Sequence, residues 1–218
     1  MMWDFFQNPI FQITIRSLQI SGTATLLSVL WSLPLGIIIG MKTFPGKQLT
    51  KGIFNALLGL PTIALGLILY LLFSKSGVLG FLSFFPSLQA IIIGQAILVT
   101  PIIVSLTTSA VESVGPEIRD LAKTLGASEV EASMAILRES IGGVVLAIIA
   151  SFNRAIAELG VALSVGANIR GHTQVLTTVI AMEVNRGNLE YSIQLMVILL
   201  AIVFTITILT NSLQRRIK

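Results

Sequence analysis

Two charged side chains, Arg154 and Glu158, interrupt an otherwise apolar segment in the second half of the sequence. Residues four apart lie on one face of a helix, so the two charges can neutralise each other. Charged groups inside a membrane are costly, and those that occur face protein or water. With the neighbouring Asn153, the pair permits two interpretations: an ion pair that fixes helix packing, or groups that line a transport pathway.

The longest polar interruption, residues 112–139, holds nine of the 24 charged residues (14 basic, 10 acidic) in the chain. Within it, Pro116 followed by Glu117 is typical of a helix start. An apolar face at helical spacing follows: Ile118, Leu121, Ala122 and Leu125. Gly126 then indicates the end of this first helix.

A second helix is predicted directly after the first. Ser128 and Glu131 form a capping-box pattern, and an apolar stripe leads from there into the next hydrophobic run: Val130, Met134, Leu137 and Ile141. Such a loop is either a solvated connection with two surface helices or a docking surface for a partner. Periodicity alone leaves both interpretations open.

A third polar group follows the charge pair and contains Asn168, Arg170 and Arg186. Basic residues at the mouth of a pathway raise the local concentration of anions, whereas isolated loop charges are usually solvated. His172 is the only histidine, and the chain has no cysteine. No transition-metal site and no catalytic residue are therefore predicted.

The composition indicates an integral membrane protein. Of 218 residues, 54% are hydrophobic and 11% charged, with a mean hydropathy of +0.92. A membrane-crossing helix needs about 20 apolar residues. Five segments meet this length, the fourth only if its charge pair is tolerated: 18–41, 53–73, 88–111, 141–167 and 192–213. We expect an all-α, polytopic fold in a single domain, residues 1–218.

The distribution of basic residues predicts the orientation. With the 112–140 loop on the cytoplasmic side, nine basic residues lie on the inner side and four on the outer side, as the positive-inside rule requires. The inner set is Lys42, Lys47, Lys51, Arg119, Lys123, Arg138, Arg215, Arg216 and Lys218, and the outer set is Arg16, Lys75, Arg170 and Arg186. Five crossings then place the N-terminus outside and the C-terminus inside. The net charge of +4 is thereby explained without a nucleic-acid partner.

Glycine and proline residues within the spans have predictable effects. Gly36 and Gly40 form a Gly-x-x-x-Gly pair that allows another helix to approach closely. Pro34, Pro61 and Pro101 each remove a backbone donor, which tends to kink a helix.

The polar loop resembles a signature of permease subunits in binding-protein-dependent ABC importers, Glu-Ala-Ala-x-x-x-Gly. Asp120, Leu121, Ala122 and Gly126 occupy its fixed positions, with Asp120 in the Glu place. The signature usually continues Ile-x-Leu-Pro; Ile136 is present, but Arg138-Glu139 replaces Leu-Pro. The resemblance implies that the first helix is a coupling helix that binds the cytoplasmic ATPase. The implied coupling residues are Pro116, Glu117, Asp120, Leu121, Ala122, Leu125, Gly126 and Ala127.

The charge pair carries a second resemblance. Residues 152–160 resemble Phe-x-Arg-Ala-x-Gly-Glu-Phe-Gly of oxyanion permeases for sulfate, molybdate and tungstate, with Ala157 and Leu159 in the Gly and Phe places. Residues 165–178 look most like the tungstate branch.

The resemblance implies a type I ABC importer permease in the cell membrane that helps to form the pathway for an oxyanion, most like tungstate. The implied partners are a cytoplasmic ATPase dimer and an extracytoplasmic oxyanion-binding protein. The sequence has no phosphate-binding loop, so ATP and Mg²⁺ are expected in the ATPase, and this chain should bind no cofactor and be no enzyme. Five helices without an inverted repeat predict a homodimer. The alternative is an ion-coupled carrier or channel that uses Arg154 and Glu158.

Overall fold

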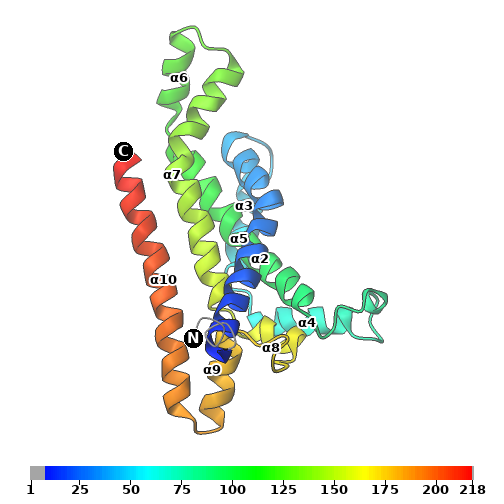
Figure 1. The fold of residues 1–218 in the computed structure, drawn as a ribbon. Helices are drawn as coiled ribbons and strands as arrows, with labels where there is room; N and C mark the ends of the chain where they lie inside the picture. Colours follow the sequence, from blue (N-terminus) through cyan, green and yellow to red (C-terminus); the bar gives the residue numbers. More distant parts are fainter. Residues whose placement is uncertain (1–7, 218) are drawn as a thin grey trace. The chain divides into compact units, whose positions relative to one another are not determined.

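A computed structural model describes residues 8–217, and this part of the chain is helical, without β-strands (Figure 1). Residues 1–7 and Lys218, the last of the basic residues assigned to the inner side, lie outside the described part. The helices in chain order are α2 (Pro9–Met41), α3 (Lys47–Leu57), α4 (Thr62–Phe73), the 3₁₀ turn η1 (Gly80–Leu82), α5 (Leu88–Ser113), α6 (Pro116–Thr124), α7 (Glu129–Ile156), α8 (Gly160–Gly166), α9 (Leu176–Asn185) and α10 (Leu189–Ile217).

Four of these helices are long and apolar enough to cross a membrane: α2, α5, α7 and the segment Leu189–Thr210 of α10. The broken pair α3 and α4 gives a fifth if it forms one span. With 26 residues, α5 is about 39 Å long, more than the roughly 30 Å hydrocarbon core. The prediction of an all-α polytopic fold is confirmed.

The predicted second span, 53–73, is two helices in the structure. Helix α3 ends at Leu57 and α4 begins at Thr62, with Pro61 immediately before it. Proline has no N–H to donate and disfavours helical geometry in the preceding residue, so the chain breaks here. Pro34 and Pro101, by contrast, lie inside the continuous helices α2 and α5.

The predicted fourth span, 141–167, also differs. Helix α7 begins at Glu129, ends at Ile156, and is followed after a short break by α8. The start lies earlier because the second helix of the polar loop continues without interruption into the apolar run. The end lies earlier because Glu158 does not continue α7: its Oε1 accepts the Val161 N–H at 3.1 Å, in the first turn of α8.

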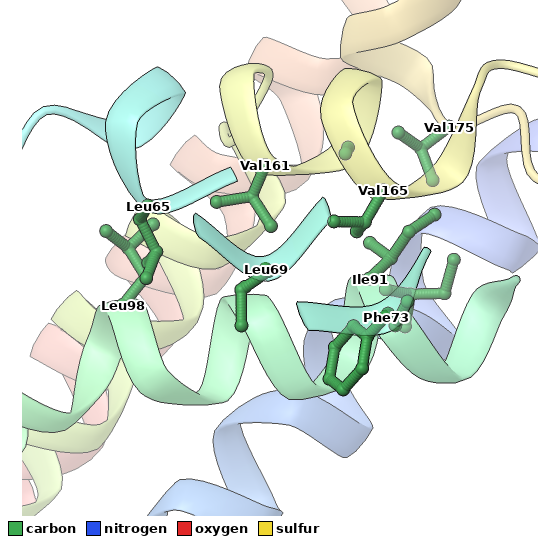
Figure 2. Packing of buried hydrophobic residues seen from close by; sticks show 11 residues of the cluster. Leu65, Leu69, Phe73, Ile91, Leu98, Val161, Val165 and Val175 are labelled. Carbon is green, nitrogen blue, oxygen red and sulfur yellow. The ribbon is translucent and has the colours of Figure 1, made fainter. Parts of the chain in front are cut away.

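The chain divides into two compact units, one made of residues 1–27, 60–99 and 152–218 and the other of residues 28–59 and 100–151. A core of the first unit lies where α4 and α8 pack together (Figure 2). Buried members include Leu65, Leu69, Phe73, Ile91, Leu98, Val161, Val165 and Val175. A second cluster joins the start of α2 to α9 and α10: Ile13, Leu176, Val179 and Leu195.

In the other unit, α2 and α5 approach closely at Gly36 and Gly40. A Cβ atom on Gly36 would lie 2.9 Å from the Cβ of Thr107, and one on Gly40 would lie 2.7 Å from the Cβ of Val111. Thr108 Oγ1 also donates a hydrogen bond to the Gly36 carbonyl at 3.1 Å. The predicted close approach of another helix is confirmed.

Candidate functional site

The first helix of the polar loop, α6, has the predicted ends. It begins at Pro116, whose side chain lies outside the described part, and Glu117 is in its first turn. After its last turn Gly126 has φ +88°, a conformation that favours glycine. The Ala127 N–H donates to the Ala122 carbonyl at 3.0 Å, and the Gly126 N–H to Lys123 at 2.9 Å. This is a Schellman motif, which stops the helix sharply.

The second helix begins with the predicted capping box. Glu131 N–H donates to Ser128 Oγ at 3.3 Å, and Ser128 N–H donates to Glu131 Oε2 at 2.7 Å. The two reciprocal bonds satisfy donors that a helix start leaves without partners. With the Schellman motif, they give α6 and the first turns of α7 a fixed helical hairpin (Figure 1).

Glu129 closes this hairpin, a role that the sequence interpretation missed. Its carboxylate contacts Arg119 Nη2 at 2.6 Å and also pairs with Lys123, so α6 is tied to the first turn of α7. The hydrogen bond to Glu129 raises the pKa of Arg119. Opposite charges on both sides of a tight turn were the available sequence signal.

The hairpin exposes apolar side chains to its surroundings. Leu125, directly after α6, is 80% exposed and Val130 on α7 is 75% exposed, and Leu121 and Met134 are exposed as well. Among the other predicted coupling residues, Glu117, Asp120 and Gly126 are exposed, whereas Ala122 and Ala127 are partly buried. Exposed apolar side chains on a structured hairpin are typical of an interaction surface. We call Leu121, Leu125, Val130 and Met134 the hairpin apolar face.

The charge pair forms as the sequence predicts, across the end of α7. Arg154 Nη1 lies 2.6 Å from Glu158 Oε2; the Glu158 side chain is 2% exposed and that of Arg154 39%. Glu158 Oε1 accepts the Val161 N–H at 3.1 Å, and Thr177 Oγ1 donates to the Glu158 carbonyl at 2.7 Å. Both carboxylate oxygens therefore have partners, and the residue joins α7, α8 and α9.

Asn153, the neighbour of the pair, contacts the last helix. Its Nδ2 donates to Thr207 Oγ1 of α10 at 2.9 Å. Its Oδ1 is buried and has no hydrogen-bond partner among residues 8–217. This geometry gives Asn153 a role in packing α7 against α10.

The segment between α8 and α9 is held by a residue that the sequence interpretation did not select. Arg16 of α2 donates to the Gly171 carbonyl at 2.7 Å and to the Gln174 carbonyl at 3.2 Å. Ser17 Oγ accepts the Leu176 N–H at 2.8 Å. These contacts span more than 150 residues of sequence, so no local pattern could have indicated them.

The three predicted outer-mouth residues, Asn168, Arg170 and Arg186, line one cavity of about 480 Å³. Arg186 Nη1 lies 2.9 Å from Glu183 Oε1, and Asn168 Nδ2 donates to the Met182 sulfur at 3.3 Å. Asn168 and Arg186 also line a neighbouring cavity of about 370 Å³. The structure thus brings these three residues together.

Residues 32–218 match the family of binding-protein-dependent transport system inner membrane components, and the chain belongs to this family. It is therefore a multi-pass inner-membrane subunit of an ABC transporter, with ATPase activity in a separate subunit.

Two relatives and one solved structure show which members of this family the chain resembles. The tungstate uptake system permease protein TupB of Peptoclostridium acidaminophilum is 37% identical over 209 residues, which cover 96% of this chain and 92% of the relative. A probable anion ABC transporter permease protein of Haloferax volcanii is also 37% identical, over 90% of this chain and 87% of the relative. A chain of the inward-facing MetNI methionine ABC transporter, 18% identical, has a TM-score of 0.76 over 97% of this chain and 99% of its own length, which shows the type I importer permease fold.

Proposed function

We propose that two copies of this chain form the translocation pathway of an ATP-driven importer whose substrate is an oxyanion, tungstate in particular. The choice of tungstate as the substrate rests on the 37% identity to a tungstate uptake permease over 96% of the chain. The remaining partners are a cytoplasmic ATPase dimer, which binds ATP and Mg²⁺, and an extracytoplasmic oxyanion-binding protein. The N-terminus lies outside, the C-terminus inside, and the chain acts as one permease domain.

The hairpin apolar face is the surface that binds the ATPase. Its hydrophobic side chains are exposed in the described part of the chain, and burial against a groove in a partner removes them from water. Helix α7 runs without a break from Glu129 to Ile156, about 42 Å at 1.5 Å per residue. The second half of the hairpin and Arg154 therefore belong to the same helix.

The ion pair at the end of that helix stabilises the junction between α7 and α8. Arg154 neutralises the Glu158 carboxylate, and each carboxylate oxygen has a partner within the chain, so we assign the pair to the junction of α7 and α8 rather than to an ion relay. Selectivity among tetrahedral dianions of similar size resides mainly in the binding protein, which can enclose the ion with many fixed donors. The permease contributes neutral hydrogen-bond donors and a few basic residues on its outer side.

Affinity purification of the tagged chain from its native membrane, followed by mass spectrometry, tests the importer assignment. An ATPase subunit and an extracytoplasmic binding protein should co-purify. The Leu125→Asp variant should lose the ATPase and retain its copy number in the membrane. A wild-type chain that purifies without an ATPase, yet moves oxyanion down an ion gradient, would instead identify a secondary carrier.

A further inference from the structure

The cavity of about 480 Å³ is built from segments far apart in sequence. The start of α2, the segment before α9, helix α9, the turn after it and the start of α10 all contribute, and all belong to one compact unit. Its lining combines apolar residues such as Ile13, Val179 and Met182 with polar residues on the predicted outer side. The wall of the cavity is therefore partly apolar and partly polar.

The acidic group of the cavity is already neutralised. Glu183 is 9% exposed, its Oε1 pairs with Arg186 at 2.9 Å, and its Oε2 accepts a hydrogen bond from Asn188 Nδ2 at 3.0 Å. Both oxygens therefore have partners within the wall. A cation entering the cavity would find no free carboxylate.

Two donor side chains of the wall, Gln174 and Arg170, are not used in this way. Gln174 is only 6% exposed, and its side-chain amide, which lines the cavity, has no hydrogen-bond partner among the described residues. Arg170 also lines the cavity, is exposed, and forms no ion pair within residues 8–217. The amide is not one of the fully buried polar groups without a partner, so it is open to the cavity and can donate to a ligand that accepts hydrogen bonds. One free positive charge beside free donors favours an anion.

We propose that this cavity is an oxyanion-binding site of the permease itself, in which the Arg170 guanidinium and the Gln174 amide hold a small tetrahedral dianion and the Tyr191 hydroxyl is a third donor. The identity of the ion rests on the proposed function. At roughly 30 Å³ per water molecule, the cavity has room for the ion with part of its hydration shell. Partial hydration makes binding weak and release fast, which suits a site that receives an ion in transit.

Equilibrium dialysis of the purified permease–ATPase complex in nanodiscs, without the binding protein, tests this site with radiolabelled tungstate, molybdate and sulfate separately. The wild type should bind one ion per permease chain. Arg170→Gln should weaken binding at least tenfold, and Gln174→Glu, which keeps the size and adds a negative charge, should abolish it. Arg170→Lys should recover part of the loss, because a cation remains. Lys75→Gln removes an exposed cation on the predicted outer side and outside the cavity lining, and should bind as the wild type does.

Two results would overturn the site: no binding by the wild type, or equal binding by the wild type and both cavity variants, which places the ion elsewhere in the complex. An unchanged Tm for each variant ensures that lost binding is not lost folding. ATP-driven uptake with the binding protein present separates this proposal from the importer assignment. Uptake without binding to the isolated complex refutes only the cavity site, whereas binding without ATP-driven uptake refutes only the importer.

Discussion

Replacing Arg154 with alanine tests whether the ion pair holds the break between α7 and α8. The change leaves Glu158 Oε2 without the guanidinium that lies 2.6 Å away. Removing one partner of a buried pair costs about 3–5 kcal/mol, and the 39% exposure of Arg154 places the expected loss at the lower end, about 3 kcal/mol. Because a chain of this size loses roughly 2–4 °C per kcal/mol, Tm should fall by about 6–12 °C.

The double variant Arg154→Ala, Glu158→Ala separates a stranded charge from lost contacts. No unpaired carboxylate remains, and the main further loss is the hydrogen bond from the Val161 N–H at 3.1 Å, worth about 1 kcal/mol. The double variant should therefore be more stable than Arg154→Ala by roughly 1–2 kcal/mol. Arg154→Ala combined with Glu158→Gln is the matched control, because it removes the charge and keeps an acceptor for Val161.

Thermal unfolding of the purified complex by circular dichroism gives Tm, and reconstituted uptake gives activity, at one fixed protein concentration. Partial recovery of both in the double variant is the expected result. The reasoning is refuted if Arg154→Ala keeps the wild-type Tm and loses uptake, with the double variant equally inactive. Arg154 would then act on the ion directly.

Three further predictions concern the hairpin, the orientation and the helix contact. Leu125→Asp should weaken ATPase association at least tenfold in a binding assay with a Tm shift equivalent to less than about 0.5 kcal/mol, because the side chain is exposed. Gly126→Pro should weaken association as well, because proline cannot adopt φ +88° and lacks the N–H that bonds Lys123. Cysteines at Lys47 and Glu131 should react with membrane-impermeant reagents only from the cytoplasm, as the distribution of basic residues requires. Gly40→Leu should lower stability by about 1–3 kcal/mol in thermal unfolding, because α5 leaves no room for the side chain.

Each of these has a contradicting outcome. Arg138→Gln, an exposed change on α7 outside the hairpin apolar face, serves as the control for ATPase binding. Equal ATPase binding by wild type and both hairpin variants would make the loop a simple connection. Labelling of either cysteine from outside would reverse the topology, and a Gly40→Leu variant as stable as the wild type would remove the close contact.

The sequence predicted the hairpin well because its signals are local. Proline at the start of α6, Gly126 at its end and the box between Ser128 and Glu131 each act within a few residues. For the same reason, the apolar runs predicted α2, α5 and α10 as membrane-spanning helices. Pro61 and the charge pair marked both positions, but the hydrophobicity of a run could not show whether a helix kinks or ends there.

Contacts between distant segments were beyond the sequence. Arg16, assigned only as an outer charge, holds the segment before α9 through two backbone carbonyls. Gln174 showed no pattern that would mark it as a cavity residue. Asn168, Arg170 and Arg186 were selected for their chemistry, and the fold brings them to one cavity through α9 and its neighbours.

Uptake of radiolabelled tungstate into proteoliposomes that hold the permease, its ATPase and the binding protein tests the central claim most directly. The account predicts uptake that requires enclosed ATP, stops when the ATPase cannot hydrolyse it, and falls when molybdate is added as a competitor. Sulfate should compete less, because the binding protein selects the ion. Robust sulfate uptake with indifference to tungstate would contradict the substrate, and tungstate uptake without ATP would contradict the importer.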